Sequence, residues 1–329
     1  MRRPPAVARV LERVTRTARE HEMFRPGDRV LVCVSGGPDS VCLLYSLWYL
    51  RRLLRIRLEA FHFDHRLRWT SGKDAEYVGR LCERLQITLH RSAAEAAPPR
   101  GDSIEAWARS RRLSAASRVA REVDADRIAT GHTQDDQAET VLAWALMGGG
   151  ARAIRAVVGP YVRPLVDVPR SDVEACCRAL HLRPRRDETN LDPRFLRNAL
   201  RLKGIPALER ATGRGVREPL ARTAALVAED EREFERQMYA VWDDVYEETP
   251  EGARLSVDRL GTAARPIARR VIEQAVFRCG VPATDADVRA ILDLAAGRPG
   301  RRRDLASGLK ARREREYVSL SRTSPESRE

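Results

Sequence analysis

Short hydrophobic runs of strand length alternate with longer segments of helical periodicity over the first half of the chain. The pattern predicts strands at 29–34, 56–63, 86–91 and 127–132, and helices that begin near residues 39, 71, 103 and 133. Strands that alternate with helices in this way form a parallel sheet covered on both faces. We therefore expect an α/β fold with a doubly wound parallel sheet, and an amphipathic N-terminal helix packed against it.

The pattern changes after residue 150, where helical periodicity dominates. Helices are predicted at 171–182 and 193–211, and the sequence ATGRGVREP (211–219) has the glycine and proline content of a hinge. This division predicts two domains, 1–215 and 216–329. We expect the second, smaller domain to be mostly helical, with some β-structure in its basic final segment.

Composition indicates a folded protein without a membrane span. Of the 329 residues, 43% are hydrophobic and 33% charged, and the apolar stretch at 41–50 is shorter than the ~20 residues that a transmembrane helix needs. The six cysteines form no CxxC pair, which favours reduced, packed thiols in a cytoplasmic protein over a zinc or iron–sulfur site. The adjacent Cys176 and Cys177 are expected to be packing residues.

The net charge of +13 is concentrated in the first part of the chain. Residues 1–215 carry 39 basic and 26 acidic side chains, whereas residues 216–329 carry 21 of each. This excess predicts an anionic partner such as nucleic acid, although a GC-rich genome would also give many arginines. The acidic segment 229–251 is not expected to line an RNA path. Five later arginines are candidates for contact with RNA: Arg301, Arg302, Arg303, Arg312 and Arg313.

A glycine turn with the sequence SGGPDS (35–40) connects the first strand to the following helix. Backbone N–H groups at a helix start bind anions, and the two glycines allow a phosphate to approach closely. The turn lacks the lysine of a Walker P-loop, which favours chemistry at the α-phosphate of a nucleotide. Asp39 is a candidate ligand for Mg²⁺. The alternative is a plain helix-capping turn with Asp39 or Ser40 as the cap.

Basic residues follow the second strand in the sequence HFDHRLR (62–68). His65, Arg66 and Arg68 come after its carboxyl end, the edge at which ligands bind in parallel sheets. His62 lies within the strand and is expected to be packed.

The sequence IEAWARSRR (104–112) places Glu105, Arg109 and Arg112 on one helical face. Two arginines on one face suit a triphosphate, and Glu105 can position Arg109. The alternative is a solvated face with an internal ion pair.

An acidic cluster follows the strand that ends at Gly131 and His132. In GHTQDDQAET (131–140), Asp135, Asp136 and Glu139 lie in the first turns of a helix at i, i+3 and i, i+4 spacing. Acidic residues at a helix start often only favour the helix. Beside an anion-binding turn, however, three carboxylates predict a bound cation.

Taken together, the motifs resemble the tRNA(Ile)-lysidine synthetases, a family of the N-type ATP pyrophosphatase (PP-loop) superfamily with a Rossmann-like fold. The motifs occur in the order and spacing of that family, and the segment 297–322 is similar to the C-terminal segment of its short members. The motifs are SGGPDS, HFDHRLR, IEAWARSRR, GHTQDDQAET, RPL (163–165) and DETNLDPRFLRNALR (187–201).

The resemblance implies a role for individual residues. For ATP binding it implies Ser35, Gly36, Gly37, Pro38, Asp39, Ser40, His65, Arg109, Arg112 and Gly131. For binding of free lysine it implies Asp135, Asp136 and Glu139, and for RNA binding Arg66, Arg68, Arg194, Arg197, Asn198 and Arg201. For catalysis it implies Asp39, Arg109, His132 and Asp136, with Asp39 as the ligand of Mg²⁺.

The activity implied by the resemblance is that of an ATP-dependent ligase. It would adenylate the wobble cytidine of tRNA(Ile) with a CAU anticodon and replace AMP with L-lysine; the oligomeric state stays open, with a homodimer as one option. Three alternatives remain: a PP-loop tRNA thiolation enzyme, a synthetase that adenylates a small metabolite, and a non-catalytic nucleotide-dependent RNA-binding protein. Sulfur incorporation, a requirement for tRNA, and the effect of Asp39→Ala would separate them.

Overall fold

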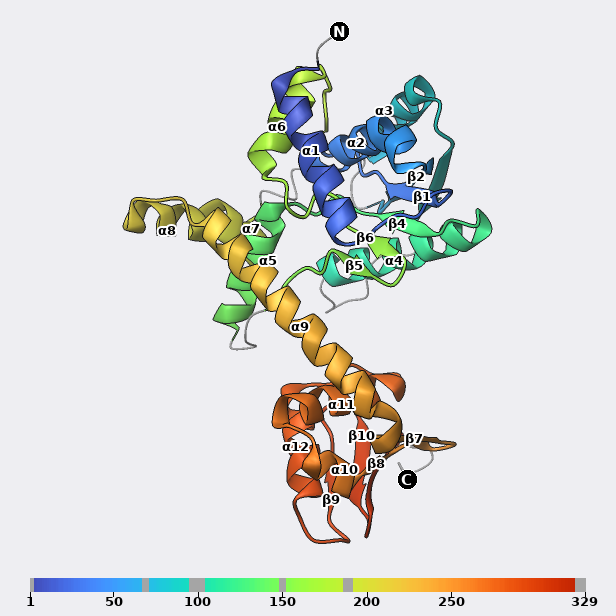
Figure 1. The fold of residues 1–329 in the computed structure, drawn as a ribbon, viewed down its shortest axis with the longest axis vertical. Coiled ribbons are helices and arrows are strands. Elements are labelled where there is room, and N and C mark those ends of the chain that lie inside the picture. Colours follow the sequence, from blue (N-terminus) through green and yellow to red (C-terminus); the bar gives the residue numbers. More distant parts are fainter. Residues whose placement is uncertain (1–2, 67–70, 95–103, 148–151, 186–191, 323–329) are drawn as a thin grey trace. The chain divides into compact units, whose positions relative to one another are not determined.

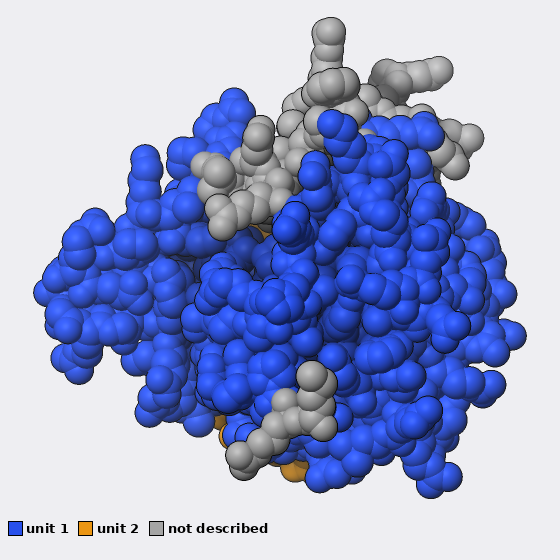
Figure 2. Space-filling model, turned by 90° about the horizontal axis from the view of Figure 1, so that it is seen from above, with its two compact units in different colours: residues 1–228 blue, residues 229–329 orange. Residues whose placement is uncertain are grey.

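The computed structural model describes residues 3–66, 71–94, 104–147, 152–185 and 192–322. The chain divides into two compact units, residues 1–228 and 229–329, which are coloured separately in Figure 2. Helix α9 (Arg217–Val245) begins within the segment predicted to be a hinge and contributes residues to both units. No helix of the described ranges has both the length and the apolar character needed to cross a membrane.

Unit 1 contains a six-stranded sheet in the order β3-β2-β1-β4-β6-β5 (Figure 1). All neighbouring strands are parallel except β5, which is antiparallel to β6. The strands are β1 (Arg29–Cys33), β2 (Arg57–Asp64), β3 (Leu89–Ala93), β4 (Arg127–Ala129), β5 (Val157–Val158) and β6 (Tyr161–Val162).

Side-chain alternation along the strands divides the interior of unit 1 between the two faces of the sheet. In β1, Val30 and Val32 pack in one hydrophobic cluster, whereas Leu31 packs in the other. The first cluster lies under helices α1 (Pro5–Glu20), α2 (Pro38–Leu54), α3 (Ser71–Leu85) and α6 (Arg170–Ala179), and the second lies under α4 (Ile104–Glu122) (Figure 1). The predicted α/β fold with a mostly parallel sheet is therefore confirmed.

The local predictions held best for the long elements. The N-terminal helix buries Val7, Val10, Leu11 and Val14 as expected, and His62 is buried with its Nδ1 2.8 Å from the Val34 carbonyl. The short strands β5 and β6 were not predicted, because two residues carry no periodic pattern. The helix expected at 193–211 is observed over 196–212 as three consecutive stretches, α7 (Leu196–Ala199), the π-helix η2 (Leu200–Gly204) and α8 (Ile205–Thr212).

Unit 2 corrects the prediction of a mostly helical second domain. Its core is a five-stranded antiparallel sheet in the order β7-β8-β11-β10-β9, one face of which packs against helices α10 (Val257–Thr262), α11 (Arg265–Arg278) and α12 (Asp285–Ala295). The strands are β7 (Tyr246–Thr249), β8 (Gly252–Ser256), β9 (Arg302–Asp304), β10 (Leu309–Arg313) and β11 (Tyr317–Arg322). The strands are short and rich in charge, which concealed their alternation of buried and exposed positions.

Candidate active site

The 35–40 turn joins β1 to α2 at the carboxyl edge of the parallel sheet. Gly36 has a φ of +94°, a left-handed value that favours glycine, and Gly37 is the N-cap of α2. The Ser35 N–H donates to Ser40 Oγ at 3.1 Å, and this hydroxyl donates to the Gly37 carbonyl at 3.0 Å. Gly37 has no side chain with which to cap α2, and its own N–H donates to Ser35 Oγ at 3.4 Å. The first N–H groups of α2 lack intrahelical acceptors, and the turn is therefore suited to an anion.

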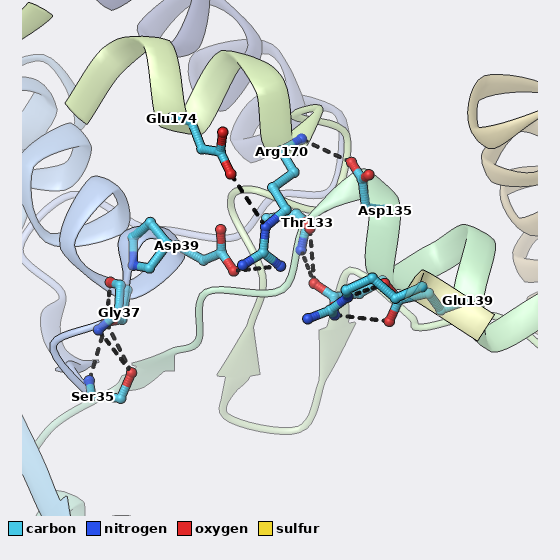
Figure 3. Close-up of polar contacts among 12 residues, drawn as sticks. Ser35, Gly37, Asp39, Thr133, Asp135, Glu139, Arg170 and Glu174 are labelled. Atoms are coloured by element: carbon cyan, nitrogen blue, oxygen red, sulfur yellow. Dashed lines mark hydrogen bonds and ion pairs between the residues drawn. The ribbon is translucent and has the colours of Figure 1, made fainter. Parts of the chain in front are cut away.

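Asp39 carries a buried oxygen that has no hydrogen-bond partner among the described residues, its Oδ1. The other oxygen, Oδ2, lies 3.5 Å from Arg170 Nη1 (Figure 3). Burial raises the pKa of Asp39 to about 6, although Arg170 acts in the opposite direction. An orphaned carboxylate oxygen beside an anion-binding turn fits a cation that is shared with phosphates. The described residues contain no group of three histidines, cysteines or carboxylates that could hold a metal by themselves.

Gly131 lies directly against the start of α2. A Cβ atom at this position would be 3.1 Å from both the Asp39 carbonyl carbon and the Ser40 nitrogen. Such contacts are with backbone, which cannot rotate away, so a side chain would displace the 35–40 turn. The glycine that follows β4 is therefore required for close approach of two segments, and not for an unusual φ.

Gly131→Ala is expected to weaken nucleotide binding by about 10-fold and to destabilise unit 1 by about 1 to 2 kcal/mol, because the added methyl group overpacks the turn. Isothermal titration with ATP and thermal unfolding measure the two effects. Gly261→Ala is the matched control, since a Cβ there meets no atom within 4 Å and alanine favours its helix. Equal ATP affinity in the Gly131 variant and the control would contradict this role of Gly131.

His132 is a neutral imidazole surrounded by positive charge. Burial lowers its pKa to about 3, with Asp136 acting against that shift and three arginines acting in favour of it. Its Nδ1 is 3.0 Å from Thr130 Oγ1. The arginines are Arg163, Arg109 and Arg112. A histidine with so low a pKa is suited to hydrogen bonding as a neutral group and is a weak proton acceptor.

Asp136 and Glu139 lie on α5 (Gln134–Leu146) and share the guanidinium of Arg201. Arg201 Nε is 2.5 Å from Glu139 Oε1, its Nη2 is 2.8 Å from Glu139 Oε2, and the same Nη2 is 3.4 Å from Asp136 Oδ1. Asp136 also accepts hydrogen bonds from the N–H and hydroxyl of Thr133, both at 2.8 Å. The acidic pair therefore holds a planar cation, the guanidinium of Arg201 from the π-helix η2.

The two carboxylates differ in their protonation energetics. Glu139 is 0% exposed, and burial raises its pKa even though Arg201 acts in the opposite direction. For Asp136, burial acts to raise the pKa, but the Thr133 hydrogen bonds and Arg201, together with His132 when it is protonated, outweigh it and lower the value. Glu139 is thus the more easily protonated member of the pair.

Asp135, the third residue predicted to bind lysine, has other partners than Asp136 and Glu139. Its Oδ2 accepts a hydrogen bond from the Arg170 N–H at 2.8 Å, and its Oδ1 is 3.3 Å from Arg217 Nη1. Asp135 thereby connects α5 to the start of α6 and to α9, while Asp136 and Glu139 share Arg201.

The residues predicted to contact RNA lie in several different environments. Arg66 is exposed, with its N–H 2.8 Å from Asp64 Oδ1, and Arg68 lies outside the described residues. Arg194 pairs with Asp192 and is largely exposed, whereas Arg197 Nη2 donates to Thr140 Oγ1 on α5 at 2.7 Å.

Asn198 and His65, two further predicted site residues, contact residues close to them in the sequence. Asn198 Nδ2 donates to the Asp192 carbonyl at 3.0 Å. The ring of His65, predicted to bind ATP, packs edge-on against Phe63 with 4.8 Å between ring centroids. The side chain of Glu105 lies outside the described part of the chain, so its predicted pairing with Arg109 remains a prediction.

Two arginines of the site were not among the predicted site residues. Arg170 contacts Asp39, Asp135 and Glu174 (Figure 3), and no local pattern marks it because its partners on α2 and α5 are distant in sequence. Arg163 lies beside His132 and begins the RPL motif. That motif was the signal that could have identified it.

Comparison with known proteins identifies the class of this fold and site. A sequence model of the PP-loop domain family matches residues 8–208, which include the 35–40 turn and the acidic pair. The chain is similar in fold to the U34-tRNA thiolase of Methanococcus maripaludis, with a TM-score of 0.57 at 16% identity over 68% of this chain and 80% of that one. At this identity the likeness concerns the fold alone.

Curated relatives identify the family more narrowly. The tRNA(Ile)-lysidine synthase of Symbiobacterium thermophilum is 38% identical over 82% of this chain and 59% of the relative. The tRNA(Ile)-lysidine synthase of Thermobifida fusca is 32% identical over 92% of this chain and 96% of the relative. The chain therefore belongs to the tRNA(Ile)-lysidine synthase family. It spans about three fifths of the length of the relatives from Symbiobacterium thermophilum and Caldanaerobacter subterraneus, and 96% of the relative from Thermobifida fusca.

Proposed function

We propose that the chain is an ATP-dependent ligase that adenylates the wobble cytidine of tRNA(Ile) with a CAU anticodon and replaces AMP with L-lysine to form lysidine. The observation that carries the proposal is the position of the acidic pair beside the 35–40 turn. Asp136 lies close enough to Asp39 to raise its pKa, and Gly131 packs on the same turn. A nucleotide site next to a cation site matches a reaction that uses ATP and an amine.

In the first step, oxygen 2 of the cytosine attacks the α-phosphorus of ATP and pyrophosphate leaves. The N–H groups of the 35–40 turn and the arginines around His132 would stabilise the negative charge of the leaving group. A wobble base lies in a loop, so it can enter the site without opening a duplex.

Asp39 fits a role as the protein ligand of Mg²⁺, because its Oδ1 is buried without a partner among the described residues. Bound Mg²⁺ would neutralise phosphate charge during pyrophosphate release. The charge of the cation would also lower the pKa of Asp39 and keep its carboxylate ionised at neutral pH.

In the second step, the ε-amine of lysine attacks carbon 2 of the adenylated base, and AMP leaves with the former oxygen 2. Asp136 and Glu139 would hold the cationic end of lysine, which must share these carboxylates with Arg201 or displace it. The amine must lose a proton before it attacks. Glu139, whose pKa is raised by burial, is a better acceptor than His132, whose pKa is lowered to about 3.

Three further proposals concern the location of the reaction, the residues that bind RNA and the oligomeric state. ATP, free lysine and tRNA would place the reaction in the cytoplasm, and the excess of basic residues in 1–215 supports an RNA partner. The residues proposed for RNA binding are Arg66, Arg68, Arg194, Arg197, Asn198 and Arg201. A homodimer stays a prediction, which analytical ultracentrifugation of the full chain tests.

The test of the proposed function is the dependence of AMP release on each substrate. With ATP, lysine and a transcript of tRNA(Ile) bearing CAU, we expect AMP and pyrophosphate in equal amounts. Omission of lysine should abolish AMP release, and a transcript with uridine at the wobble position should abolish both. AMP release that ignores lysine, from a folded preparation, would contradict the proposal.

The same reaction separates the alternative activities. A thiolation enzyme would release AMP only with a sulfur donor and would incorporate labelled sulfur into the tRNA. A small-metabolite synthetase would release AMP without tRNA. Asp39→Ala would leave RNA function unchanged in a non-catalytic binding protein. Each of these results would replace the lysidine proposal.

A further inference from the structure

Arg163 lies at the same sheet edge as the 35–40 turn, one residue beyond β6. Val162 pairs with Ala129 of β4, and the Thr130 N–H donates to the Val162 carbonyl at 3.0 Å. The chain therefore leaves the sheet at Arg163 on the same edge as at the segment that carries Gly131 and His132. Since β4 pairs in turn with β1, both strand ends lie beside the nucleotide turn.

The guanidinium of Arg163 is partly buried among other positive charges. Its Nη1 donates to the Arg155 carbonyl at 2.5 Å, and its buried Nε has no partner among the described residues. No carboxylate in the described part of the chain pairs with it, and the charged groups that act on it are Arg109 and Arg155. Burial and these two arginines lower the pKa of Arg163 to about 10.

Such an arrangement is unfavourable unless an anion completes it. Partial burial of a cation without a counter-ion is unfavourable, and two neighbouring guanidinium groups add to that cost. A guanidinium also has five N–H donors, of which the protein satisfies few here. The Arg155 carbonyl accepts a hydrogen bond from one of these donors. A role in fixing the 152–163 segment therefore explains one N–H donor of the side chain and not the others.

The positive charges of three arginines from two segments act on His132. Arg109 and Arg112 come from α4, Arg163 comes from the end of β6, and each of them acts to lower the pKa of His132. Gly131, next to His132, contacts the backbone of Asp39 and Ser40. The three arginines therefore add positive charge near the segment that carries Gly131 and His132, which contacts the 35–40 turn.

We infer that Arg163 binds a phosphate group of ATP, together with Arg109 and Arg112, on the β6 side of the 35–40 turn. The inference rests on the proposed use of ATP and extends it to a residue outside the predicted site. The planar fork of the guanidinium, which can contact two phosphate oxygens at once, makes arginine suitable for this position.

The test compares Arg163→Met and Arg163→Lys with the unmodified full chain by titration with ATP and with inorganic pyrophosphate in the presence of Mg²⁺. We expect Arg163→Met to raise the Kd for ATP about 10-fold to 100-fold, the effect of losing hydrogen bonds to a charged group. Arg163→Lys keeps the charge but not the fork and should give a smaller increase. The melting temperature of Arg163→Met without ligand should not fall, because the variant removes a partly buried cation that pairs with no carboxylate of the described residues.

Arg127→Met is the matched control, since Arg127 lies at the opposite end of β4 and pairs with Asp28. Its Kd for ATP should be unchanged. If Arg163→Met keeps its ATP affinity but binds tRNA less tightly, the phosphate belongs to the RNA and the inference is wrong. An unchanged ATP affinity with a lower melting temperature would also overturn it, by giving Arg163 a structural role alone.

If Arg163→Met does not fold, Arg163→Lys still tests the inference. Its ammonium group keeps the positive charge and can donate to the Arg155 carbonyl, as the wild-type arginine does. Equal ATP affinity in Arg163→Lys and wild type would then count against a forked phosphate contact. Because ATP binding needs neither tRNA nor lysine, an effect on Kd would survive even if the proposed lysidine chemistry failed.

Discussion

Asp39→Asn is expected to reduce the rate of adenylation by about 100-fold or more, with little harm to the fold. The variant removes the charge of a buried carboxylate oxygen that no described residue satisfies, which is the position best suited to a cation shared with ATP. Pyrophosphate release in a single turnover with saturating tRNA measures the rate. Mg²⁺-dependent ATP binding is a second readout, and it should weaken as well.

The same variant should be at least as stable as the wild type at neutral pH. The pKa of Asp39 is about 6 in the folded state and 3.8 ordinarily, so the wild type loses stability as the pH rises from about 4 to about 6. Two pKa units correspond to about 3 kcal/mol at most. Asparagine removes this loss, and chemical unfolding at pH 5 and pH 7 measures it.

Arg170→Met provides the control for Asp39. Arg170 also contacts Asp39 but is not placed to hold a cation, so its replacement should alter the pH dependence of ATP binding more than the limiting rate. Full adenylation activity in Asp39→Asn would contradict the role assigned to Asp39.

Glu139→Gln is expected to slow the lysine-dependent step strongly while adenylation continues. The change leaves Arg201 without its bidentate carboxylate partner, which should cost about 2 to 4 kcal/mol of stability because Glu139 is fully buried. The loss of a carboxylate that binds the amine should reduce the rate of AMP release by about 100-fold. Pyrophosphate and AMP, measured in the same reaction, separate the two steps.

A double variant distinguishes loss of stability from loss of lysine binding. Glu139→Gln combined with Arg201→Met removes both members of the buried pair and should recover most of the stability. Lysine-dependent AMP release should remain low in the double variant. If the double variant regained full lysine dependence, Glu139 would be only a structural partner of Arg201.

The sequence predicted the elements whose signals are local. The SGGPDS turn follows a hydrophobic strand and opens a helix with a proline at its start, and the structure has β1, the turn and α2 at those positions. The N-terminal helix and the spacing of Asp136 and Glu139 on α5 were predictable for the same reason. Each of these features depends on residues within a few positions of one another.

The features that were missed depend on contacts between distant residues. Arg201 was predicted to bind RNA, and its pairing with Glu139 and Asp136 joins residues 62 and 65 positions apart, which no local pattern reveals. Arg170 and Asp39 are likewise far apart in sequence. In unit 2, β10 alternates buried Leu309 and Ala311 with exposed Lys310 and Arg312, a strand pattern that was present but too short to predict the sheet.

Mass spectrometry of the wobble nucleoside tests the central claim most directly. The full chain is incubated with ATP, Mg²⁺, isotopically labelled lysine and the CAU transcript of tRNA(Ile), and the tRNA is then digested to nucleosides. We predict a cytidine derivative that has gained one labelled lysine with loss of one water, in wild type and not in Asp39→Asn. An unmodified wobble cytidine, or one that carries sulfur in place of lysine, would contradict the account.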